Sequence, residues 1–90
     1  MALMLLGLPF VVSAQNQKVT INVKDVDVQV VFKQIKEQTS LNFVYNADQL
    51  KVMKAVTLDV KDVTVDAALA KLFEGTAFEY KFEMQSIVIK

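Results

Sequence analysis

Apolar and polar residues alternate along the first polar stretch of the chain. From Lys18 to Lys24 every second residue is β-branched and apolar, and the residues between them are polar. This period of two predicts a half-buried β-strand. The spacing then changes to i, i+3, i+4, i+7, in Val28, Val31, Phe32 and Ile35. That spacing predicts one apolar stripe of a helix that ends near Thr39. Asp25 and Asp27 precede it and supply a turn and a helix N-cap.

The same two periods return later in the chain. Alternation predicts further strands at Leu41–Tyr45, Val56–Val60, Phe78–Phe82 and Ile87–Ile89, with a tight turn near Met84. A second helix is expected to begin after Thr64 as its N-cap and to stop at Gly75. Its stripe is Val65, Ala68, Leu69, Leu72 and Phe73. The predicted order is β-α-β, connector, β-α-β-β, an α+β fold. The connector is residues 46–54, with room for one helical turn.

The sequence contains an internal repeat. Residues 19–28 read VTINVKDVDV, and residues 56–65, 37 positions further on, read VTLDVKDVTV. Two copies are too few for a solenoid, so we expect one small domain of two related halves. The doubled Lys-Asp, at Lys24-Asp25 and Lys61-Asp62, is expected to form the same strand-to-helix turn in both halves.

Composition excludes several kinds of chemistry. The 90 residues carry 10 Lys and 10 acids, no Arg, no His and no Cys. A neutral chain without Arg is a poor binder of nucleic acid. Without His or Cys there is no thiolate and no imidazole base, so we expect no catalytic site and no cofactor.

Other candidate sites have a simpler interpretation. Asp25 with Asp27, or Asp59 with Asp62, could be thought to bind calcium, but the EF-hand loop is absent, so we expect capping acids and no metal site. Asp66 and Glu74 lie two turns apart on a helix and do not predict a hydrolytic pair. The aromatic set at positions 78, 80 and 82 is expected to pack in the core and not to stack on bases.

The two similar halves together resemble a known family. The ordered set of KVTINVKDVDV, FVYN, VTLDVKDVTV and a closing IVI over residues 18–90 is similar to the STN domain, the secretin and TonB-receptor N-terminal domain. It is most similar to the versions at the periplasmic N-terminus of TonB-dependent outer-membrane receptors. The resemblance implies two β-α-β units, with the helices side by side between small sheets. The family usually has Thr-Gly after each helix, where this chain has Thr39-Ser40 and Thr76-Ala77.

The resemblance also implies a function. An STN domain of a receptor is a non-catalytic periplasmic module that relays ligand occupancy to an anti-sigma regulator. Its other partner would be the plug and barrel of the same receptor, which tethers it to the outer membrane. Two alternatives remain: a structural N-terminal domain of a secretin-type channel, or a free-standing small binding module.

Two regions are candidate partner-binding sites. The connector has no counterpart in the repeat and offers Asp48, Gln49, Lys51 and Lys54, and loops often carry function. The last strand is expected to present an open edge for β-augmentation by a partner strand. Its residues are Ile87, Val88, Ile89 and Lys90.

The N-terminus resembles a signal peptide. Residues 1–12 are apolar, and Val12-Ser13-Ala14 places small or short side chains where signal peptidase cleaves. The usual basic start is missing, since the chain opens with Met-Ala-Leu. We predict export and cleavage after Ala14, so residues 1–14 are the signal peptide and 15–90 the domain. N-terminal sequencing of the exported protein should begin at Gln15; retention of Met1 would contradict the prediction.

Overall fold

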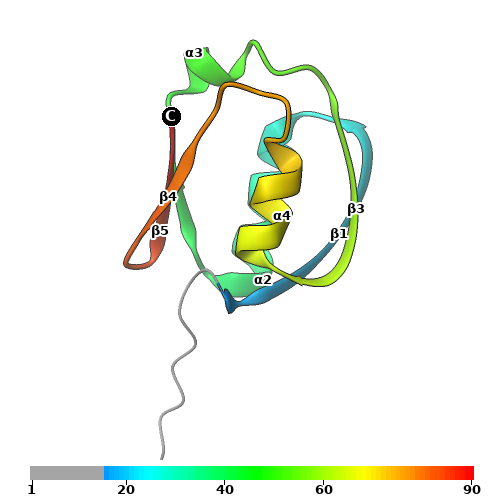
Figure 1. Ribbon diagram of the computed structural model, residues 1–90, viewed down its shortest axis with the longest axis vertical. Helices are drawn as coiled ribbons and strands as arrows, with labels where there is room; N and C mark the ends of the chain where they lie inside the picture. The colour runs from blue at the N-terminus through cyan, green and yellow to red at the C-terminus, as the bar shows by residue number, and fades with distance from the viewer. Residues whose placement is uncertain (1–15) are drawn as a thin grey trace, which may run out of the picture.

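The computed structural model describes residues 16–90 (Figure 1). Its strands and helices are β1 (Lys18–Val26), α2 (Val28–Thr39), β2 (Asn42–Val44), α3 (Ala47–Leu50), β3 (Val56–Thr64), α4 (Val65–Leu72), β4 (Tyr80–Glu83) and β5 (Ser86–Ile89). This is the predicted order, and α3 is the helical turn expected in the connector. The predicted cleavage site after Ala14 lies outside the described residues.

The strands form two small sheets that each combine both halves of the chain. β1 pairs with β3 antiparallel in a two-stranded sheet. The other sheet has the order β2-β5-β4, with β2 parallel and β4 antiparallel to β5. Helices α2 and α4 lie between the two sheets (Figure 1). The predicted α+β fold is confirmed.

Both long helices begin at the predicted N-caps. The Asp27 carboxylate accepts a hydrogen bond of 2.9 Å from the Gln29 amide, and the Thr64 hydroxyl accepts one of 3.1 Å from the Ala67 amide. The predicted end of the second helix is wrong. α4 ends at Leu72 with Phe73 as its C-cap, and Gly75 lies in the following turn with φ +80°. Glycine suits that turn, because it adopts a positive φ without the steric cost that most other residues have.

The doubled Lys-Asp lies within strands β1 and β3. The prediction that it forms a strand-to-helix turn is therefore wrong. β1 has an extra residue between Val23 and Val26, and β3 has one between Val60 and Val63. Asp25 and Asp62 each have φ 52° at these bulges. A β-bulge leaves its extra residue outside the ladder and bends the strand. The strands therefore run on beyond the predicted ends and reach the helix caps directly.

Side chains from both helices and both sheets form one core. The residues of the two predicted helical stripes are all buried, as are Ile87 and Ile89 of β5. Phe32 of α2 stacks on Phe43 at a centroid distance of 4.3 Å and lies 6.4 Å from Phe73 at the end of α4. The aromatic set at positions 78, 80 and 82 is half-buried against this core, as expected.

A tyrosine joins the second sheet to the start of α4. The Tyr80 hydroxyl donates a hydrogen bond of 2.7 Å to the Asp66 carboxylate. Burial, followed by this bond and the charge of Asp66, raises the pKa of Tyr80 to about 12. A raised pKa means that the neutral phenol is favoured in the folded state. The stabilisation is therefore complete below pH 10 and is lost only as the pH rises towards 12.

Truncation of either helix stripe should largely unfold the domain. Phe32 is 4% exposed and Leu69 is fully buried. Replacement of such a side chain by Ala costs about 2–5 kcal/mol, a large share of the ~5–15 kcal/mol that stabilises a typical domain. We expect Phe32→Ala and Leu69→Ala each to lower the melting temperature by about 10 °C or more in a thermal melt. The matched control Lys33→Ala, at an exposed position of α2, should melt like the wild type. A small shift for either core variant would contradict this packing.

Candidate functional site

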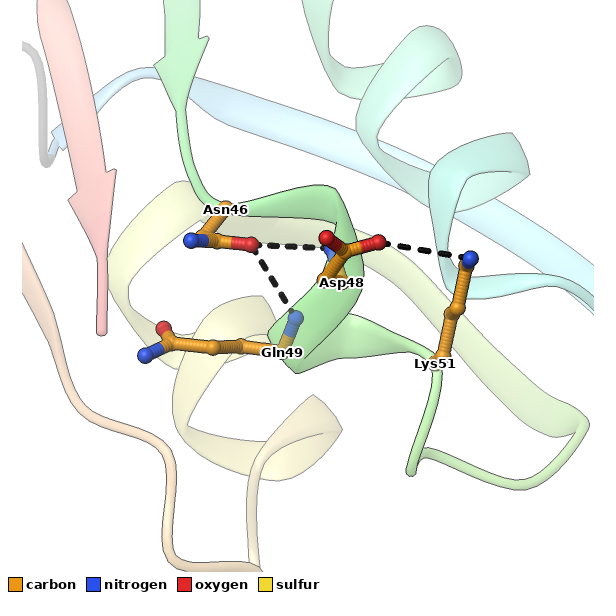
Figure 2. Close-up of polar contacts among 4 residues, drawn as sticks. All are labelled: Asn46, Asp48, Gln49 and Lys51. Atoms are coloured by element: carbon orange, nitrogen blue, oxygen red, sulfur yellow. Dashed lines mark hydrogen bonds and ion pairs between the residues drawn. The ribbon is translucent and has the colours of Figure 1, made fainter.

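The connector is held in a fixed shape by its first residue. The Asn46 side-chain oxygen accepts hydrogen bonds from the amides of Asp48, at 2.9 Å, and Gln49, at 3.2 Å (Figure 2). Asn is a preferred N-cap because its side chain satisfies amides that have no partner within the helix. At the other end of α3, Leu50 is 4% exposed and anchors the turn in the core. Asp48, Gln49 and the C-cap residue Lys51 are thus presented on an ordered helical turn, and Lys54 lies after it.

Two of the four predicted connector residues pair with each other. The Lys51 ammonium lies 3.3 Å from the Asp48 carboxylate, and both side chains are more than three-quarters exposed. Gln49 points to the other side of α3 from this pair (Figure 2). An exposed ion pair of this kind contributes at most about 1 kcal/mol, so the pair does not determine the shape of the connector. Asp48 and Lys51 therefore remain available to a partner.

The expectation that the last strand has an open edge is wrong. β5 is the middle strand of its sheet, with β2 on one side and β4 on the other. Ile87 and Ile89 point into the core, and Val88 is half-buried. Since β5 has partners on both sides, it cannot accept a further strand. A proline at Val88 would remove a ladder donor and disrupt the fold, so it cannot serve as a test of binding.

Lys90 nevertheless lies at a surface that the connector shares. Its backbone exchanges two hydrogen bonds with Glu79, of 2.7 and 2.9 Å, which extend the pairing of β4 and β5. Its side chain is exposed and lines an open groove of about 870 Å³. This groove, which we call the end groove, lies between the connector, the start of β3 and the loop from α4 to β4. Its lining includes Gln49, Lys54, Lys71, Glu74, Phe78 and Lys90. In Figure 1 these segments meet at the end of the molecule where α3 and the C-terminus lie.

The end groove brings some of the predicted residues together and leaves others out. Gln49 and Lys54 of the connector and Lys90 of the last strand line it, whereas Asp48, Lys51 and residues 87–89 do not. Lys71 of α4 and Glu74 of the turn after it were missed, because neither the period of a helix nor a turn marks such an exposed polar residue as functional. The charged lining is three Lys against one Glu. Val52 and Met53 add an apolar side to the groove, and Val52 is 76% exposed.

Residues 16–90 show neither a metal-ion cluster nor a membrane-spanning helix. No three acidic side chains in that range come close enough together to hold a metal ion. Within the same range, no helix is both long and apolar enough to cross a membrane. All four aspartates of the two pairs are exposed: Asp25 and Asp62 lie at the bulges, Asp27 is the N-cap of α2, and Asp59 is a paired residue of β3.

Comparisons with known proteins identify the fold and the family. The family described as "Secretin and TonB N terminus short domain", STN, matches residues 41–90. No curated protein matches the chain in sequence. Among solved structures, the ferripyoverdine receptor of the outer membrane of Pseudomonas aeruginosa, bound to ferripyoverdine, is similar with a TM-score of 0.66 at 16% identity. The match covers 82% of this chain and 10% of the receptor chain, so it shows a shared fold over a small part of that protein.

Proposed function

The chain belongs to the STN family, and we propose from this that it is a periplasmic signalling domain of a TonB-dependent outer-membrane receptor. In this proposal the domain is exported, binds a periplasmic anti-sigma regulator and relays to it whether the receptor holds its ligand. It catalyses no reaction and needs no cofactor. The family match over residues 41–90 is the observation that carries the proposal.

The fold similarity supports a receptor rather than a secretion channel. The similar solved structure is that of an outer-membrane receptor. The family name covers secretins as well, and a structural domain of a secretin-type channel is the alternative. The two differ in what the domain is joined to: a plug and barrel in a receptor, or repeated ring-building domains in a secretin.

The surface supports binding by the ordered connector. Gln49 lies on the capped, core-anchored helix α3, and it lines the end groove together with Lys54 and Lys90. A pre-formed surface loses little conformational entropy on binding. We therefore place the regulator over the connector, where it covers the end groove and also contacts the exposed Asp48–Lys51 pair on the other side of α3.

A binding experiment tests this function. The 90-residue chain should retain the periplasmic domain of an anti-sigma regulator encoded beside it in a pull-down. Reversal of the two exposed connector charges, by Asp48→Lys with Lys51→Asp, should weaken binding about threefold to tenfold, while the swapped pair can still form and the fold should persist. Lys33→Glu, at an exposed residue of α2, is the matched control and should bind like the wild type.

One pair of results would contradict the proposed signalling function. If the wild-type chain retains no such regulator, and the receptor still signals after residues 15–90 are deleted, the domain has no role in signalling.

A further inference from the structure

A side chain of the first half occupies the outer edge of β1. The Gln38 side-chain oxygen accepts a hydrogen bond of 2.9 Å from the Thr20 amide, and its side-chain nitrogen donates one of 2.9 Å to the Thr20 carbonyl. The carboxamide thus replaces one residue of a neighbouring strand. It satisfies a donor and an acceptor that would otherwise be open at a sheet edge.

The corresponding edge in the second half is that of Thr57. Thr57 is 37 residues after Thr20, in the same sequence context, and lies opposite the bulge at Asp25 as Thr20 lies opposite the bulge at Asp62. Its neighbours Val56 and Leu58 are paired to β1. Because successive residues of an antiparallel strand point their backbone groups to alternate sides, the amide and carbonyl of Thr57 point outward, away from β1.

In the second half, the position that corresponds to Gln38 is occupied by a glycine. Gly75 is 37 residues after Gln38, and α4 ends at Leu72 whereas α2 continues to Thr39. A Cβ built at Gly75 would meet no atom within 4 Å, so there is open space beside it. Thr57 and Gly75 both line the end groove. In the first half, the Gln38 side chain pairs with the backbone of Thr20. In the second half, no side chain at position 75 can do the same for Thr57, and this open edge lies in the end groove.

We propose that the end groove binds an extended acidic segment of the regulator, which pairs with the outward backbone groups of Thr57 as Gln38 pairs with those of Thr20. This inference rests on the proposed function, and it adds the site and the chemistry of the bound segment. The segment supplies one amide and one carbonyl to Thr57. Its carboxylates face Lys54, Lys71 and Lys90, which outnumber the single acid Glu74 in the lining.

The three lysines and the outward backbone groups of Thr57 contribute to binding in different ways. The three lysines are exposed, so they attract an acidic chain and their effect is screened by salt. The backbone pair at Thr57 sets the direction of the bound strand, as in other cases of strand addition to a sheet edge. An extended chain alternates its side chains, so acidic residues can face the lysines while the residues between them lie over Met53 and Phe78, both half-buried lining residues.

The test uses short peptides and the 90-residue chain. The probe is an acetylated, amidated hexapeptide of alternating Glu and Val, titrated at low salt and followed by amide chemical shifts in NMR. We expect the largest shifts at Thr57, Gly75 and Lys54, and an affinity that falls as salt is added. The Lys54→Glu, Lys71→Glu double variant should bind about tenfold more weakly, and Lys33→Glu should bind like the wild type.

Two further probes separate the charges from the edge. A hexapeptide of alternating Lys and Val should not bind, because its charge is wrong. The acidic peptide with N-methylated backbone keeps its charge but cannot donate to the Thr57 carbonyl, so it should bind at least several-fold more weakly. Equal binding of the methylated peptide, or shifts centred away from Thr57, would overturn the proposal.

The experiments distinguish a failure of this proposal from a failure of the proposed function. If the regulator binds the wild-type chain but the Lys54→Glu, Lys71→Glu variant binds it equally well, the end groove is not the docking site and the signalling role stands. If the wild-type chain binds no regulator, and the receptor still signals after residues 15–90 are deleted, the signalling role itself is wrong, whatever the peptides do.

Discussion

The fold depends on the bulged pairing of β1 with β3. In each strand the bulge takes one aspartate amide out of the ladder, and a threonine of the other strand accepts its hydrogen bond. The Thr57 hydroxyl accepts from the Asp25 amide at 3.1 Å, and the Thr20 hydroxyl accepts from the Asp62 amide at 2.9 Å. Asp is suited to these positions because its short polar side chain tolerates a positive φ. Since α2 and α4 begin directly after these strands, the pairing also sets where both helices enter the core.

Much of this arrangement could be predicted from the sequence. Period-two and helical spacing located the strands, the helices and the buried faces, because burial of an apolar face is a local property of the pattern. The residue types Asp27 and Thr64 located the two N-caps. The strand partners could not be predicted in the same way. That β5 lies between β2 and β4 depends on contacts between distant segments, and an alternating pattern is the same in an edge strand and a central one. The bulges were missed because a Lys-Asp pair is equally typical of a turn.

The candidate site, too, could be predicted from the sequence only in part. Gln49, Lys54 and Lys90 were predicted as separate candidates, and only the fold brings them to one groove. Lys71 and Thr57 carry no local signal, since one is an ordinary polar residue of a helix and the other of a strand. The useful signal was the difference between the two halves. Where the first half has Gln38, the second has Gly75, and that substitution leaves an open strand edge inside the groove.

Amide hydrogen exchange at Thr20 and Thr57 tests this difference most directly. Both threonines follow a valine, so their intrinsic exchange rates are closely matched. The Thr20 amide donates to Gln38, and a hydrogen bond worth about 0.5–1.5 kcal/mol should slow its exchange several-fold relative to that of Thr57. Gln38→Ala should bring the Thr20 rate up to that of Thr57 and leave Thr57 unchanged. Equal protection of the two amides in the wild-type chain would contradict the account, because the edge at Thr57 would then not be open.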